Sequence, residues 1–143
     1  MEEVFVEKDI DKIAKKVLKT LKPSDVVAFS GPLSAGKTRL IQSIMRSMNY
    51  YGKVTSPTFV LEKNYPVDHH GIKEVVHLDF YRLNEDALKS FGWQEYLNQK
   101  DTLTLIEWSE RAQNLLPDNI KKITLEIIDD KLRRITYNPD SVN

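Results

Sequence analysis

The sequence contains no cysteine among its 143 residues. This absence excludes disulfide bonds, thiolate metal sites and a cysteine nucleophile. The chain also lacks a net charge, because 21 lysine and arginine residues balance 21 aspartate and glutamate residues. No overall field therefore draws it to a polyanion, and contact with RNA would need a local patch or a partner. We expect no binding to DNA or to membranes.

Long apolar runs and a targeting segment are missing as well. No stretch approaches the ~20 apolar residues that a membrane helix needs. The first ten residues, MEEVFVEKDI, are acidic and lack the basic region and apolar stretch of an export signal. Repeats, low-complexity tracts and linker-like segments are absent too. The sequence therefore predicts one cytoplasmic domain over residues 1–143, large enough to bury an adequate core.

What the sequence does contain is an alternation of short apolar runs and amphipathic segments. Apolar residues at spacings of three and four predict helices, which we place at 10–21, 37–48, 84–90 and 109–116. Lysines occupy the opposite face of the first helix, as a solvated face or an RNA-contacting patch. Unbroken or alternating apolar runs predict strands, which we place at 4–6, 26–29, 58–65, 74–81 and 102–108.

Two further features complete the predicted fold. The polar segment PVDHHGIK, residues 66–73, is expected to be a loop between two strands, with His69 and His70 solvated. The segments 122–128 and 133–138 flank DDKL, which predicts an antiparallel C-terminal hairpin. Strands alternating with helices favour an α/β fold, a three-layer sandwich of the P-loop NTPase type around a mostly parallel sheet.

The segment GPLSAGKT at residues 31–38 fits the pattern G-x-x-x-x-G-K-[ST]. Glycines let a loop wrap closely around a phosphate, and the following helix adds its unpaired N–H groups. Lys37 would reach the β- and γ-phosphates, and the Thr38 hydroxyl would bind Mg²⁺. The alternative is a flexible connector, but a buried strand before the loop and a helix after it favour a nucleotide site. Its expected lining is Gly31, Pro32, Leu33, Ser34, Ala35, Gly36, Lys37, Thr38 and Arg39.

Two loop positions are less favourable. Pro32 has no backbone N–H to donate, although the N–H groups nearest the phosphates come later in the loop. Ser34 would carry strain of about 1 kcal/mol if its backbone must adopt a positive φ. We expect such strain to weaken nucleotide affinity without abolishing it.

Acidic residues end two of the predicted strands. Asp79 closes VVHLD and Glu107 closes LTLIE. Ligands of open α/β sheets bind beyond the carboxyl ends of the strands, so both acids should face the phosphate loop. Either can hold Mg²⁺ directly or through water while the other orients the attacking water. The alternative is a pair of solvated strand-end acids. His77 shares a strand face with Asp79, which favours a buried, hydrogen-bonded histidine near the site over a general base.

With SPTF, HLDFYRL, IEW and LLP following the loop in that order, the chain resembles the bacterial TsaE (YjeE) family, which serves tRNA threonylcarbamoyladenosine biosynthesis. The resemblance runs from about residue 9 to about residue 128. It implies a P-loop ATPase that binds ATP and Mg²⁺, docks on a TsaB–TsaD-type complex and resets it by hydrolysis. tRNA is then met only through that complex, and isolated members hydrolyse ATP poorly.

The resemblance also assigns residues. Lys37, Asp79 and Glu107 become catalytic, and Thr38 joins the two acids at the metal. Thr58 becomes a switch-like residue in the VTSPTF segment, which the sequence alone favours only as a turn. Trp108 is implied beside the nucleotide. The chain departs from the family pattern at Pro32, where an acid is usual, and at Ser34, where glycine is usual.

Two other functions remain open on the sequence alone. A small-molecule P-loop kinase would also use the phosphate loop, but no segment is long enough for both an arginine-rich lid and an acceptor pocket. A module that binds nucleotide without hydrolysing it, and only recruits partners, is the other alternative. ADP release and the identity of any phosphorylated product distinguish the three.

Overall fold

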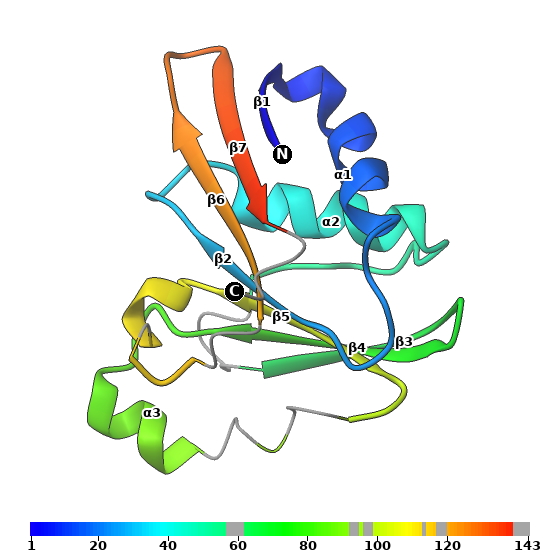
Figure 1. The fold of residues 1–143 in the computed structure, drawn as a ribbon, viewed down its shortest axis with the longest axis vertical. Coiled ribbons are helices and arrows are strands. Elements are labelled where there is room, and N and C mark those ends of the chain that lie inside the picture. The colour runs from blue at the N-terminus through cyan, green and yellow to red at the C-terminus, as the bar shows by residue number, and fades with distance from the viewer. Residues whose placement is uncertain (57–61, 92–94, 96–98, 113, 117–119, 139–143) are drawn as a thin grey trace.

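The computed structural model describes residues 1–56, 62–91, 95, 99–112, 114–116 and 120–138 (Figure 1). Within these residues seven strands form one sheet in the order β1-β7-β6-β2-β5-β4-β3. The strands are β1 (Glu2–Val6), β2 (Val26–Ser30), β3 (Glu62–His69), β4 (Ile72–Asp79), β5 (Thr102–Glu107), β6 (Lys121–Ile127) and β7 (Leu132–Asn138). The helices are α1 (Ile10–Leu18), α2 (Lys37–Ser47) and α3 (Glu85–Phe91), with short 3-10 turns η1 (Glu7–Asp9) and η3 (Ser109–Ala112).

Strand β2 lies near the middle of the sheet, between β5 and β6, and is parallel to both. Strand β4 continues the parallel part beyond β5. The outer strands pair antiparallel, β3 with β4, β7 with β6, and β1 with β7. The sheet is therefore mixed, with a parallel centre, and the predicted C-terminal hairpin is confirmed.

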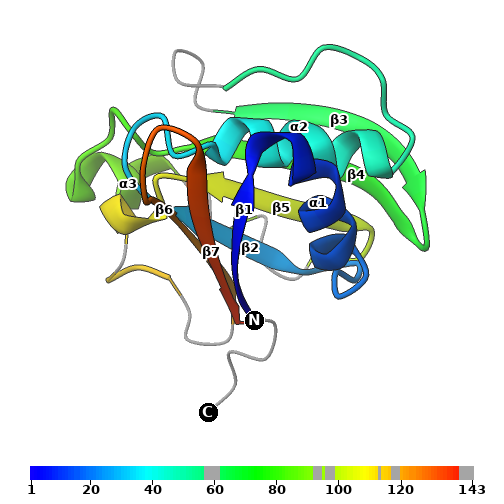
Figure 2. The same cartoon turned by 90° about the horizontal axis from the view of Figure 1, so that it is seen from above.

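The sheet separates two layers of helix (Figures 1 and 2). Helices α1 and α2 cover one face and α3 lies on the other. Residues of β2 are buried alternately on both sides: Val27 and Phe29 pack in the cluster with α1 and α2, whereas Val26 and Ala28 pack in the cluster with Leu88 of α3. This burial on both faces explains the unbroken apolar run of β2. The predicted three-layer α/β fold is confirmed.

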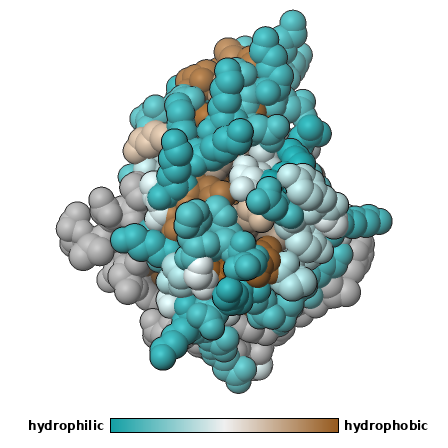
Figure 3. Space-filling view, turned by 90° about the vertical axis from the view of Figure 1, so that its right-hand side faces the viewer, coloured by the Kyte–Doolittle hydropathy of each residue, from teal (hydrophilic) through white to brown (hydrophobic). Residues whose placement is uncertain are grey.

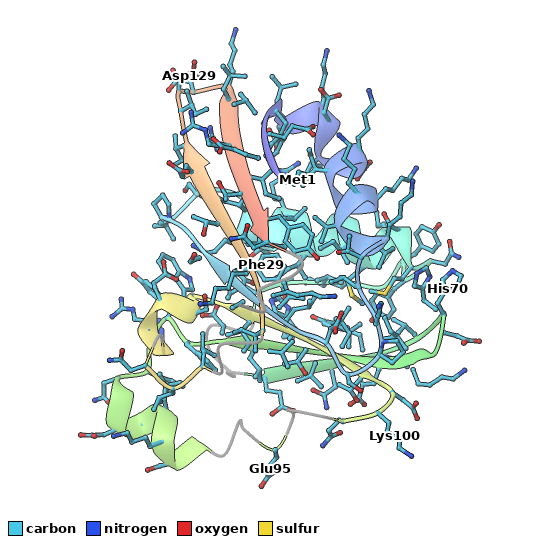
Figure 4. All side chains as sticks on the ribbon, in the orientation of Figure 1. Met1, Phe29, His70, Glu95, Lys100 and Asp129 are labelled. Atoms are coloured by element: carbon cyan, nitrogen blue, oxygen red, sulfur yellow. The ribbon has the colours of Figure 1, made fainter. Side chains whose placement is uncertain are left out.

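The expected loop over residues 66–73 is wrong. Strand β3 continues to His69, and the turn contains only His70 and Gly71, whose φ values of 46° and 90° are both positive. Figure 4 shows His70 at the outer end of this hairpin. Pro66 is tolerated because β3 is an edge strand, and the register shifts between Pro66 and His69.

Other boundaries differ by a few residues. Helix α1 ends at Leu18 rather than near residue 21. Residues 109–112 form a 3-10 turn instead of the start of an α-helix. Asn84 precedes α3, and its side-chain oxygen accepts a hydrogen bond from the Ala87 N–H at 2.7 Å. This bond caps the first turn of the helix. Residues 58–61 of one expected strand lie outside the described residues.

The surface on the side of α1 and the β3–β4 turn is mostly hydrophilic, with small separate hydrophobic areas (Figure 3). The lysines on the outer face of α1 and just after it are all exposed, as both a solvated face and an RNA-contacting patch require: Lys12, Lys15, Lys16, Lys19 and Lys22. Among the described residues, no helix combines the length and the apolar composition needed to cross a membrane.

Candidate functional site

The loop between β2 and α2 contains three residues with a positive φ. Gly31, Ser34 and Gly36 have φ values of 143°, 68° and 104°. A Cβ added at Gly31 would overlap the carbonyl oxygen of Leu125 on β6, so only glycine fits there. Ser34 occupies the left-handed region that the sequence reasoning considered, at a cost of about 1 kcal/mol. The loop ends at the N-terminus of α2, whose free N–H groups suit an anion.

Lys37 is the first residue of α2, and only 5% of it is exposed. Its ammonium donates hydrogen bonds to the carbonyl oxygens of Gly31 and of Pro32, the latter at 3.3 Å. It also lies 3.5 Å from the centroid of the Trp108 ring, within the range of a cation–π interaction. Burial lowers the pKa of Lys37, while nearby carboxylates, led by Glu110, act in the opposite direction. The loop and Trp108 therefore hold the ammonium between them.

Thr38, Glu107 and His77 form a chain of hydrogen bonds. The Thr38 hydroxyl donates to Oε1 of Glu107 at 2.8 Å, and Nε2 of His77 lies 2.6 Å from Oε2 of the same carboxylate. Glu107 is 2% exposed and His77 is fully buried. With Glu107 as a carboxylate, which can only accept, Nε2 of His77 is the donor of this hydrogen bond. These contacts join α2, β5 and β4 at the carboxyl edge of the sheet.

Asp79 ends β4 in register with Glu107 on β5. It is buried, and its two oxygens accept hydrogen bonds from the Ser56 hydroxyl at 2.6 Å and from the Tyr81 N–H at 2.8 Å. The two acids are thus neighbours on adjacent strand ends, where the strand-end rule predicted them. In the described part of the chain, no group of three or more histidine, aspartate or glutamate residues could hold a metal by itself.

Trp108 follows β5 with a φ of 59°. A positive φ at a bulky residue is uncommon and costs about 1–3 kcal/mol. This backbone places the indole beside Lys37 and 4.7 Å, between centroids, from the ring of Tyr81. The Arg111 guanidinium lies over the ring of Tyr81, 5.5 Å from its centroid. The strained position therefore belongs to a pair of neighbouring aromatic rings, with Lys37 against Trp108 and Arg111 against Tyr81.

Sequence reasoning did not identify two residues of η3. Glu110 accepts a hydrogen bond from the Gly31 N–H at 3.2 Å, and Arg111 contacts Tyr81 as described. Ser109, between Trp108 and Glu110, is buried and donates to the carbonyl oxygen of Phe29 at 3.1 Å, which ties η3 to β2. Glu110 and Arg111 follow the carboxyl end of β5 directly, and this position in the sequence could have identified them as site residues.

A groove of about 450 Å³ adjoins the loop on the side of Ser34 and Gly36. Its apolar wall consists of Phe5, Val6 and Ile10, and its polar residues are Glu7, Lys8, Ser34, Arg39, Asp130, Lys131 and Arg133. Arg39 and Glu7 form an ion pair across 2.6 Å. The pairing of β1 with β7 brings the start and the end of the chain together here. No local pattern in the sequence signals this groove.

The predicted site residues mostly gather at one edge. Around the carboxyl ends of β2, β5 and β4 lie the loop from Gly31 to Gly36 and five further predicted residues: Lys37, Thr38, Asp79, Glu107 and Trp108. Arg39 lines the groove, and Leu33, in the loop, is 70% exposed. Thr58 lies outside the described residues.

Comparisons with known proteins place the chain in one family. The model of the family described as threonylcarbamoyl adenosine biosynthesis protein TsaE matches residues 5–135. A tRNA threonylcarbamoyladenosine biosynthesis protein TsaE from Rickettsia felis is 36% identical over 131 residues, which are 89% of this chain and 72% of that protein. The protein of the same description from Bacillus subtilis is 32% identical over 125 residues, 87% of this chain and 76% of that protein.

A solved structure has the same fold. The crystal structure of YdiB from Bacillus subtilis superposes with a TM-score of 0.78 and 25% sequence identity. The alignment covers 96% of this chain and 83% of that chain.

Proposed function

This chain belongs to the TsaE family of threonylcarbamoyladenosine biosynthesis proteins, and we propose that it is an ATPase that uses Mg–ATP in that tRNA modification. The observation that carries the proposal is the loop with Lys37 at its end and Thr38 bonded to Glu107. A phosphate-binding loop supplies the anion site, and an acid beside its hydroxyl supplies the place for a cation.

Phosphate binding is supported by the backbone N–H groups at the start of α2 and by the ammonium of Lys37. The N–H groups of the first turn of α2 lack helical partners, and their dipole favours a negative charge. In this structure the Lys37 ammonium donates hydrogen bonds to two carbonyl oxygens of the loop. A bound triphosphate would compete for this ammonium, which can turn from the carbonyl oxygens to phosphate oxygens.

The residues present fit Mg²⁺. This ion binds hard oxygen ligands, usually one or two carboxylates together with phosphate oxygens and waters. The Thr38 hydroxyl and the Glu107 carboxylate already lie 2.8 Å apart, and Asp79 ends the adjacent strand. Bound there, Mg²⁺ would neutralise charge on the phosphate oxygens. Thr38 and one acid would hold it, and the other acid would orient the attacking water by accepting its hydrogen bond.

The groove beside the loop fits the nucleoside part of ATP. Its volume of about 450 Å³ lies in the range of small-molecule sites. Phe5, Val6 and Ile10 offer an apolar wall to a base, and the charged residues of the β6–β7 turn offer hydrogen bonds. Because the groove adjoins Ser34 and Gly36, one ligand can place its phosphates on α2 and its base in the groove.

The experiment is to measure nucleotide hydrolysis by the pure chain with and without a TsaB–TsaD-type complex and tRNA. We expect slow ADP release alone and faster release in the complex, because phosphoryl transfer depends on charges that a partner can position. Lys37→Ala should abolish the stimulated rate. ATP binding without hydrolysis in the complex would favour a recruitment module, and a phosphorylated small molecule would favour a kinase.

A further inference from the structure

We propose that His77 is a positioning residue that holds the Glu107 carboxylate in place for the metal end of the phosphate site. The inference rests on the proposed function, because it concerns what Glu107 does beside Thr38. It assigns a role to a residue that is buried in the sheet and would not touch nucleotide.

The register of the sheet explains how the contact arises. His77 on β4 is opposite Leu105 on β5, and Asp79 is opposite Glu107. In a parallel pair, opposite residues and residues two positions further on lie on the same face. The Glu107 side chain therefore leads diagonally back toward His77, and the two meet at 2.6 Å.

The carboxylate of Glu107 is held at both oxygens. His77 engages Oε2 from β4, and Thr38 donates to Oε1 from α2. A cation bound at Oε1 would compete with the hydrogen bond that Thr38 donates there. Among the described residues, His77 would then be the side chain that still fixes the carboxylate. A buried acid held on one side keeps its free oxygen directed at the site.

A packing role for His77 is unfavourable. The residue is fully buried, and its Nδ1 is among the buried atoms that have no hydrogen-bond partner in the described structure. A buried nitrogen without a partner destabilises the fold, so an aliphatic residue would fill this space at lower cost. The bond to Glu107 is what a histidine adds here.

A role as general base is excluded by the same geometry. Nε2 is occupied by Glu107, and the imidazole has no exposed surface through which a substrate water could reach Nδ1. His77 therefore acts through Glu107 rather than on a substrate. This decides between the two alternatives that the sequence left open for His77.

The test uses three substitutions that separate position from volume. His77→Gln places an amide N–H₂ near the position of Nε2, His77→Asn places one near Nδ1, and His77→Leu keeps the volume without a donor. His70→Gln, at the exposed end of the β3–β4 hairpin, is the control. Each variant is titrated with a fluorescent ATP analogue over a range of Mg²⁺ concentrations and again with excess EDTA.

We expect the Mg²⁺ concentration for half-maximal binding to rise about 10-fold to 100-fold in His77→Leu and His77→Asn, as for other partners of metal ligands. His77→Gln should stay within about threefold of the wild type, because it retains the donor. Binding in EDTA should be unchanged in every variant. Melting temperatures show whether each variant is folded before it is titrated.

Three results would overturn the inference. They are a His77→Leu variant with the Mg²⁺ dependence of the wild type, a glutamine variant no better than the leucine variant, and equal losses of binding in EDTA and in Mg²⁺. The last would mark a purely structural histidine. Wild-type chain that shows Mg²⁺-dependent binding but no hydrolysis in the complex would contradict only the ATPase proposal, and the titration would still decide the role of His77.

Discussion

At the scale of single residues, Glu110 has a charge that opposes the ligand we propose. Its carboxylate accepts from the Gly31 N–H and is the leading charge partner of Lys37. We expect Glu110→Gln to bind ATP about fivefold more tightly, since about 1 kcal/mol of repulsion is removed at an exposed site. Calorimetric titration measures this change. Glu95→Gln, which removes the same charge from an exposed position outside the site, should leave affinity unaltered, and an equal gain there would contradict the local explanation.

The site residues that the sequence predicted belong either to a local motif or to the end of a strand. Lys37 and Thr38 belong to a local motif, and Asp79 and Glu107 end strands, so their convergence follows from the carboxyl-edge rule. His77 was expected to be buried and hydrogen-bonded, but its partner depends on the register of β4 against β5. Glu110 contacts a residue 79 positions away. No spacing in the sequence encodes contacts of that kind.

At the scale of elements, Asp11 connects the two helices on one face of the sheet. It accepts from the Ser43 hydroxyl and from Arg46, the latter at 3.0 Å. The hydrogen bond from Ser43, followed by that from Arg46, lowers the pKa of Asp11. The stabilisation is therefore present above the unfolded-state pKa of ~3.9 and is lost as the pH falls through the lower folded-state value.

We expect Asp11→Asn to be less stable than the wild type at pH 7 by less than about 1 kcal/mol, because the pair is exposed and screened by solvent. The difference should shrink as the pH is lowered below about 4. Urea unfolding of both proteins at several pH values between 7 and 3 measures it. A gap that stays constant over this range would show that the charge of Asp11 is not its cause.

The hairpin of β3 and β4 shows why one element was misread. PVDHHGIK is rich in turn-forming residues, yet pairing with β4 extends β3 to His69 and leaves a two-residue turn. Gly71 has a φ of 90°, and a Cβ there would lie 3.0 Å from Cγ of Pro23. Tertiary pairing thus outweighed the local preference, and the glycine marks the turn itself.

Gly71→Ala should lower the free energy of unfolding by about 1–2 kcal/mol, because alanine is strained at a positive φ. Thermal unfolding is the measurement. His70→Gly places glycine, which tolerates a positive φ, at the neighbouring turn position. It should change the free energy of unfolding by no more than about 0.5 kcal/mol. A Gly71→Ala protein as stable as the wild type would mean that the turn can adopt another backbone.

At the scale of the whole molecule, the groove depends on segments that are far apart in the sequence. Val6 lies on its apolar wall, and Asp130 and Lys131 of the β6–β7 turn belong to the same lining. We expect Val6→Tyr to fill the groove and to weaken ATP binding about tenfold, or about 1.4 kcal/mol. Binding of inorganic tripolyphosphate, which has no base, should be retained. Calorimetry with both ligands measures this, and equal losses would show that the groove does not hold the nucleoside.

The layered fold was predictable because apolar periodicity and the order of elements determine it. The groove was not, since the edge strand β1 finds its partner β7 more than a hundred residues away. The balanced charge of the chain gave no indication of it either. Global pairing, rather than any local signal, creates this surface.

The same pairing has a consequence for synthesis on the ribosome. Of the described strands, β1 is made first, but its neighbour in the sheet, β7, is made last. The amino group of Met1 donates to the carbonyl oxygen of Tyr137 at 2.7 Å. A nascent chain that stops after β6 already contains the phosphate loop and both acids, yet lacks one wall of the groove. Competence to hold a complete nucleotide should therefore arise only after β7 has been made.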